Sequence, residues 1–176
     1  MAKIRIYSLL DEHGQDVISL CLMHIKTKQY TQLKKGEVEK KCMDKIVALL
    51  HYVNMQTLQT DGVYCKTLVG NIVELRIPLP RSKYLLRIIA CTWRWSCLLL
   101  TWWLIKPERY DDAGQTQSVL LEYDQQIEYA KQCREDFTHR QLLAYTDLTD
   151  LFFPHSSHAH APNNTPAKKP GQNEVY

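Results

Sequence analysis

The strongest constraint on the fold lies in residues 70–106, where three apolar runs follow one another with short breaks between them. β-Branched, aromatic and leucine residues fill these runs, and the run lengths suit strands better than helices. The runs are residues 72–77, 84–91 and 97–105. This pattern predicts an antiparallel meander of three strands. It does not predict a membrane-spanning helix, because Arg87 and Arg94 interrupt the stretch and such a helix needs about 20 apolar residues.

The rest of the chain supplies helices for this sheet. Residues 3–10 alternate like a first strand, and Asp16 can cap a helix. Residues 37–55 carry an apolar stripe at helical spacing opposite a charged, solvated side. A third helix is predicted from Ser118 or Asp124 to residue 143. This order predicts an α+β fold with the helices on one face of the sheet and the other face partly open.

The same pattern predicts which residues pack between the second helix and the sheet. The helix stripe should contact the sheet through Cys42, Ile46, Leu49 and Val53. Both sides of each strand are apolar, so alternation alone does not assign the two faces. The sheet candidates are Leu75, Ile77, Leu86, Ile88, Leu98 and Leu100.

Composition places these elements in one domain with a tail. The chain has 176 residues, and we predict a domain at residues 1–150 and a disordered tail at residues 151–176, where no periodicity is left. His155, His158 and His160 lie in that tail without a scaffold, so no metal site is predicted, and no motif calls for a cofactor. The net charge of +3 permits a polyanionic partner without requiring one.

The cysteines and the N-terminus predict a cytoplasmic protein. The first residues lack the long apolar segment of a secretory signal. None of the 6 cysteines forms a CxxC pair, and the apolar runs hold several of them. We therefore expect buried, reduced thiols rather than disulfides or a zinc site. They are Cys21, Cys42, Cys65, Cys91, Cys97 and Cys133.

Cations inside the apolar strands are the main functional signal. Arg76 and Arg87 lie within two strands and Lys106 closes the third, and such cations need water, a partner or a ligand. One interpretation is structural: Glu74 lies two residues before Arg76, on the same face, and can pair with either arginine. The other is a phosphate-binding sheet face, since guanidinium groups bind phosphate oxygens bidentately. The sequence leaves both open.

Residues in and after the meander resemble a known family. Their order and spacing are similar to those of the phage-derived branch of the RelE/HigB-like toxins of bacterial type II toxin–antitoxin systems. The matching residues are Leu68, Gly70, Glu74, Leu75, Arg76, Arg87, Ile88, Ile89, Leu98, Leu99, Leu100, Trp103, Lys106, Ile127, Ala130, Arg134, Asp136 and Phe137.

The resemblance implies a RelE-like fold, with two N-terminal helices packed on a curved antiparallel sheet and a C-terminal helix. It implies a cytoplasmic mRNA interferase, an endoribonuclease that often acts on ribosome-bound message. It also implies an antitoxin partner, frequently with a helix-turn-helix. By motif, the catalytic positions are Arg76, Arg87 and Lys106. We add Arg81 and Lys83, in the turn between two strands, and Trp103, which can stack on a base, as candidate RNA-binding residues.

The chemistry of arginine and lysine indicates which step of RNA cleavage each candidate residue can perform. Arginine cannot accept a proton, so Arg76 and Arg87 should hold the scissile phosphate and stabilise its transition-state charge. Lys106 is the candidate for proton transfer, because two neighbouring arginines would lower its pKa. Tyr84 is a second candidate that should face the other side of its strand. The alternative is a non-catalytic binding module of the same fold that poisons a topoisomerase or acts as a regulatory protein of a mobile element.

Overall fold

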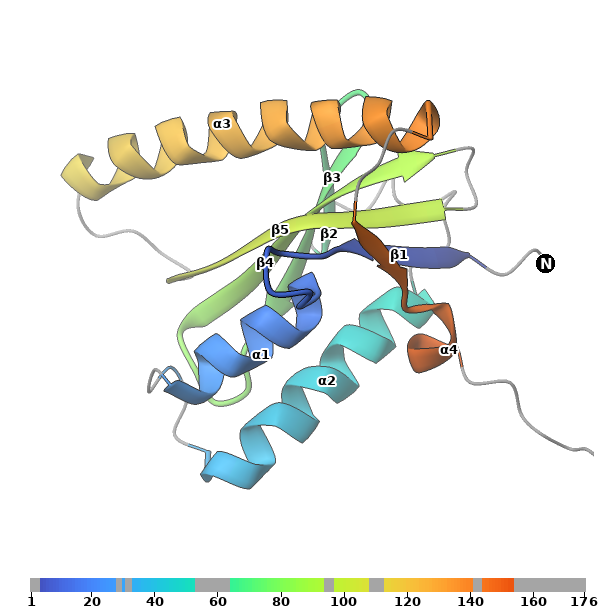
Figure 1. Cartoon of the computed structure of the whole chain (residues 1–176). Helices are drawn as coiled ribbons and strands as arrows, with labels where there is room; N and C mark the ends of the chain where they lie inside the picture. Colours follow the sequence, from blue (N-terminus) through green and yellow to red (C-terminus); the bar gives the residue numbers. More distant parts are fainter. Residues whose placement is uncertain are drawn as a thin grey trace, which may run out of the picture.

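The computed structural model describes residues 4–27, 30, 33–52, 64–93, 97–107, 113–140 and 144–153. Within these residues, six strands form one sheet in the order β2-β3-β4-β5-β1-β6, and four helices pack around it (Figure 1). The elements are β1 Arg5–Leu9, α1 Val17–Thr27, α2 Lys35–Tyr52, β2 Cys65–Val69, β3 Ile72–Pro78, β4 Tyr84–Trp93, β5 Cys97–Pro107, α3 Ala113–Thr138, β6 Tyr145–Asp147 and α4 Thr149–Phe152.

The predicted meander is confirmed and gains a strand. β3, β4 and β5 pair antiparallel, and β2, which was not predicted, extends the series at one edge. At the other side, β1 pairs parallel to β5. The prediction of a wholly antiparallel sheet is wrong at this junction. Two helices separate β1 from the meander, and a crossover of this length allows parallel pairing.

Helices cover both faces of the sheet. α1, α2 and α4 lie on one face and α3 lies alone on the other, along β4 and β5 (Figure 1). The prediction that all helices share one face is therefore wrong. The reason is visible at Ile88 and Ile89, which are adjacent in β4, point to opposite faces and are both 0 % exposed. A sheet that is apolar on both sides needs cover on both sides.

The larger core lies between the sheet and helices α1, α2 and α4. All six predicted sheet residues are buried in it, and Cys42, Ile46 and Leu49 of α2 pack there. The prediction for this interface is confirmed, except that Val53 lies outside the described residues. The opposite side of α2 is exposed, as expected. Its exposed charged residues are Glu37, Glu39, Lys40, Lys41, Asp44 and Lys45.

Two elements near the C-terminus were not predicted. β6 forms an edge strand on β1, and α4 buries Phe152 completely in the larger core. The backbone amide of Leu148 donates to the carbonyl of Ile6 at 2.8 Å, which fixes this segment to β1. The predicted domain boundary at residue 150 thus falls inside α4. The tail histidines, His155, His158 and His160, lie outside the described residues.

α3 begins and ends earlier than predicted, spanning Ala113–Thr138. Arg140 follows it with a φ of 56°, a left-handed conformation common where helices end. All six cysteines are buried free thiols, as predicted. Among the described residues, no helix combines the length and the apolar character that crossing a membrane requires.

Candidate functional site

The strand register brings the predicted cations together on the face covered by α3. Arg76 of β3 lies directly opposite Arg87 of β4, and Glu74 lies two residues before Arg76 on the same face. Leu104 of β5 lies opposite Arg87, so Lys106, two residues further, also faces α3. Tyr123 of α3 lies against this group. We call Glu74, Arg76, Arg87, Lys106 and Tyr123 the charged cluster.

Glu74 is the centre of the charged cluster. Its side chain is 1 % exposed, and its two oxygens bind different arginines. Arg76 Nε donates to Oε2 at 3.0 Å and Arg87 Nη1 donates to Oε1 at 3.0 Å. Two like charges directly opposite on neighbouring strands repel each other, and the shared carboxylate offsets that repulsion. The structural interpretation of Glu74 is confirmed, with both arginines rather than one.

Lys106 is the least compensated charge of the cluster. It is 6 % exposed, and none of the described carboxylates forms an ion pair with it. Its Nζ lies 5.2 Å from the centroid of the Tyr123 ring, a cation–π contact. Burial lowers the pKa of Lys106, and Arg87 lowers it further, while Glu122 and Glu74 act in the opposite direction. The expected direction is confirmed, although burial rather than the arginines is the main cause.

Tyr123 is the cluster residue that sequence reasoning missed. Its hydroxyl is buried without a hydrogen-bond partner, and so is Nε of Arg87. Each such group costs about 1–3 kcal/mol relative to a satisfied one. Burial and the carboxylate of Glu74 raise the pKa of Tyr123, while Arg87 opposes the shift, so the hydroxyl keeps its proton at neutral pH. The only sequence signal was a hydroxyl within the apolar stripe of α3.

The cluster has more positive charge and more donors than its carboxylate can satisfy. Within the charged cluster, three basic side chains face a single buried carboxylate, that of Glu74, and the exposed Glu122 of α3 acts on Lys106 from outside the cluster. The unpartnered Arg87 Nε is a donor, and the unpartnered Tyr123 hydroxyl can donate as well. An oxyanion with several oxygens, such as a phosphate, matches this set better than any neutral ligand.

The remaining predicted residues lie outside the cluster. Arg81 and Lys83 are exposed in the turn between β3 and β4, at the end of the strands where Lys106 lies. Trp103 lies on the opposite face, packed against the larger core with its ring centroid 5.0 Å from that of His24. The structure does not bring it to the arginines. Tyr84 also faces the other side, as expected, with its ring 5.1 Å from that of Tyr30.

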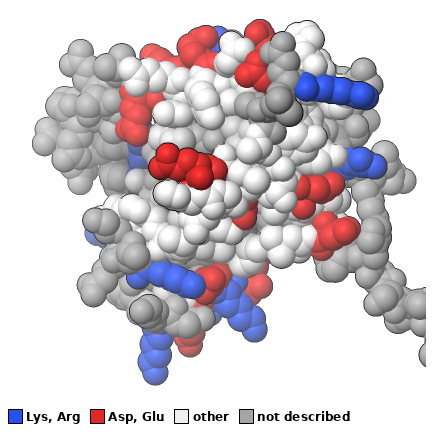
Figure 2. All heavy atoms as spheres, viewed as in Figure 1, with Lys and Arg blue, Asp and Glu red and all other residues white. Residues whose placement is uncertain are grey.

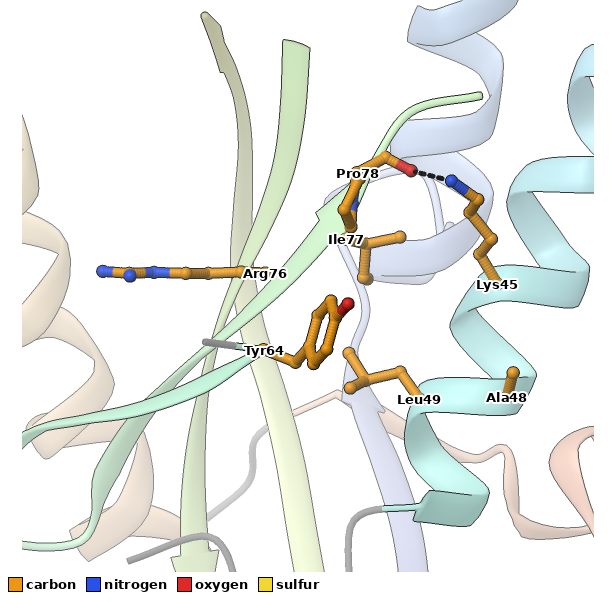
Figure 3. A pocket seen from close by; sticks show the side chains of 7 residues that line it. All are labelled: Lys45, Ala48, Leu49, Tyr64, Arg76, Ile77 and Pro78. Carbon is orange, nitrogen blue, oxygen red and sulfur yellow. Dashed lines mark hydrogen bonds between the residues drawn. The ribbon is translucent and has the colours of Figure 1, made fainter. Parts of the chain in front are cut away.

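A separate pocket of about 400 Å³ lies between α2 and β3 (Figure 3). Arg76 borders it, but its guanidinium group points away from the pocket toward the α3 side (Figure 3). At the rim, Lys45 Nζ donates to the carbonyl of Pro78 at 2.9 Å. The pocket is mostly apolar, and it is not part of the charged cluster. Its lining residues are Lys45, Ala48, Leu49, Tyr64, Arg76, Ile77 and Pro78.

The surface in view adds no broad basic patch to the cluster. On that face, the described Lys and Arg side chains are scattered among Asp and Glu (Figure 2). Within the described part of the chain, no group of three or more His, Cys, Asp or Glu side chains is arranged to hold a metal ion. Comparisons of the chain with protein-family models and with curated proteins found no match.

Proposed function

We propose that this protein is the toxin of a type II toxin–antitoxin system and cleaves mRNA at the charged cluster. The observation that carries the proposal is the register of Arg76 opposite Arg87, with Lys106 on the same face. Two guanidinium groups at neighbouring positions can bind one phosphodiester through several charge-assisted hydrogen bonds. The resemblance of the meander to RelE/HigB-like toxins supports the choice of RNA as the substrate.

The cluster supplies the groups that cleavage by the ribose 2′-hydroxyl requires. Arg76 and Arg87 hold the phosphate and stabilise the charge that develops on it, while Glu74 fixes both guanidinium groups. Lys106 in its neutral form takes the 2′-hydroxyl proton, which its lowered pKa favours. The 2′-oxygen then bonds to phosphorus, and the bond to the 5′-oxygen breaks. Tyr123, which remains protonated, gives its proton to the departing oxygen.

The test is cleavage of RNA by the purified chain, with and without ribosomes, followed by mapping of the new 5′ ends. Arg76→Ala and Arg87→Ala should each lower the rate by about 10²–10³, because each removes one charge-stabilising donor. Lys40→Ala is the matched control: it removes an exposed cation of α2, on the other face of the sheet. RNA binding should also weaken with added salt. A wild-type chain that cleaves no RNA in either setting would exclude the enzyme.

The proposal includes an antitoxin that holds the enzyme inactive. In the structure, α3 lies on the sheet face that carries the charged cluster. The antitoxin therefore has to bind the outer side of α3 or displace it. Expression of the chain alone should stop growth, and co-expression of a small helix-turn-helix protein from the adjacent reading frame should restore it. Expression of the chain alone as a folded monomer, without any effect on growth, would contradict the need for an antitoxin.

One observation favours a second candidate, the non-catalytic binding module. Lys106 is 6 % exposed under α3, so in this arrangement substrate has little access to the proposed base. In that case the cluster only fastens α3 to the sheet, and the protein acts by docking to a topoisomerase or a regulatory partner. A DNA-damage response on expression, without loss of message, would identify the topoisomerase poison. No growth effect would favour the regulatory protein.

A further inference from the structure

The pocket between α2 and β3 lies at the margin of the larger core (Figure 3). The buried Ile77 and the half-buried Leu49 line it, and both belong to that core. Ala48 and Pro78, which also line it, are exposed. The pocket therefore opens from solvent onto side chains of the core. Its volume of about 400 Å³ falls within the range of small-molecule sites, roughly 300–1,000 Å³.

The walls of the pocket are shaped for an apolar ligand. Lys45, Ala48 and Leu49 are three and four residues apart, so they lie on one side of α2. Ala48 carries only a methyl group there, which leaves space between the helix and β3. The ring of Tyr64 lies beside Ile77 and Leu49 and forms a third wall (Figure 3). An apolar group that enters this space leaves water for contact with aliphatic and aromatic side chains, which is favourable.

Lys45 adds one positive charge at the rim of the pocket. Its Nζ donates to the carbonyl of Pro78 at 2.9 Å, and within the described part of the chain no carboxylate forms an ion pair with it. An ammonium group has three donors, so two are left for a ligand. The guanidinium group of Arg76 points away from the pocket and pairs with Glu74. A ligand here meets a single cation at one end of an apolar space.

We propose that this pocket binds an amphipathic anion, a small molecule with an apolar body and one carboxylate. The body packs against Leu49, Ile77 and the ring of Tyr64, and the carboxylate accepts a hydrogen bond from Lys45 Nζ. A nucleotide does not fit, because these walls cannot satisfy the polar groups of its base and sugar. The inference does not depend on RNA cleavage, since none of the groups that hold the ligand belongs to the charged cluster.

Octanoate and octanol test the site as a matched pair of probes. They share the apolar chain and differ in the head group. We expect octanoate to bind about tenfold more tightly than octanol, because only the carboxylate can pair with the charge of Lys45. Calorimetric titration of the full chain measures both affinities. Equal affinities, or no binding of octanoate at millimolar concentration, would overturn the proposal.

Two substitutions at exposed positions of α2 assign these affinities to the pocket. Lys45→Gln should weaken octanoate binding about tenfold, to the level of octanol, and leave octanol binding unchanged. Ala48→Phe should abolish binding of both probes, because the larger side chain fills the space. Lys40→Gln is the matched control, since Lys40 is an exposed cation of the same helix that does not line the pocket. Wild-type affinity for octanoate in Lys45→Gln or in Ala48→Phe would overturn the proposal.

Nuclear magnetic resonance locates the bound probe without any variant. Nuclear Overhauser contacts should join the octanoate chain to the methyl groups of Ala48, Leu49 and Ile77. Contacts with Tyr123 instead would place the anion at the charged cluster and overturn the proposal. Because no measurement contains RNA, a chain that cleaves no RNA can still bind octanoate in the pocket. A chain that cleaves RNA but fails to bind octanoate would lose this site and keep the enzyme.

Discussion

The two faces of the sheet are both covered by helices, but the residues buried on each face differ in kind. On the face of α1, α2 and α4, the buried residues form a continuous apolar core that includes stripes from α1 and α2. On the face of α3, the apolar cluster is small, and beside it the helix covers a carboxylate, two arginines and a lysine. An apolar core stabilises any well-packed arrangement, whereas buried charges stabilise only the arrangement in which each is paired. The first face is therefore suited to stability and the second to binding or switching.

Adjacent isoleucines in β4 give the sharpest test of this difference. Ile88 faces the large core, Ile89 faces α3, and both are 0 % exposed. We expect Ile88→Ala to lower the free energy of unfolding by about 4 kcal/mol and Ile89→Ala by about 2 kcal/mol, since α3 can settle into the space that is left. Urea unfolding followed by circular dichroism measures both. Equal losses would mean that the two faces are equally rigid.

Removal of the buried carboxylate should have the next largest effect. Glu74→Gln removes the carboxylate that two partly buried, directly opposed arginines share, and we expect a loss of about 3 kcal/mol. Glu39→Gln is the matched control on the other side of the molecule, because its partner Lys26 forms an exposed ion pair. That loss should be at most about 1 kcal/mol. If thermal unfolding gives similar losses for both variants, Glu74 does not hold the cluster together.

Removal of a tyrosine hydroxyl should change the stability in opposite directions on the two faces of the sheet. Tyr123→Phe removes a buried hydroxyl that has no partner, so the protein should gain about 1 kcal/mol of stability. Tyr30→Phe removes the hydrogen bond of 3.0 Å to His24 Nε2 and should lose about 1 kcal/mol. Chemical denaturation of both variants compares them. A loss in Tyr123→Phe would reveal a hydrogen bond of that hydroxyl in solution.

The contribution of Lys106 to the pH dependence of stability should be the smallest of these effects. Its folded-state pKa lies below the unfolded value, so the unfolded chain binds more protons in the window between the two. The destabilisation from Lys106 is therefore complete below its folded-state pKa and is relieved as pH rises from there toward about 10.5. We expect Lys106→Met to unfold at a higher temperature than the wild type at pH 7, with a difference that shrinks as pH rises. A difference that grows with pH would contradict the direction of the shift.

Much of the fold was predictable because it depends on local patterns. The three apolar runs, the stripe of α2 and its contacts at Cys42 and Ile46 follow from period and length. Strand β2 was missed because Lys66 and Thr67 carry no apolar alternation, and β6 because three residues are too few to show one. Both are edge strands, and the pairing with a neighbour defines them more than their own sequence does.

The site was predictable only in part for the same reason. Two-residue alternation placed Glu74 and Arg76 on one face, but only the register showed that Arg76 and Arg87 are directly opposite. Tyr123 was one polar atom in an apolar stripe, and Trp103 was assigned to RNA although it packs on the other face. Composition states which groups can bind a phosphate, while the pairing of strands decides which of them meet.

The sequence by itself determined the meander, the helix that packs on it, the reduced cysteines and the cations that have to find partners. Each of these follows from the chemistry of residues close together in the chain. Only the tertiary structure decided that β1 lies parallel beside β5, that α3 covers the charged face and that Tyr123 closes over Lys106. Strands that are apolar on both sides leave their two faces equivalent in sequence, and long-range packing breaks that equivalence.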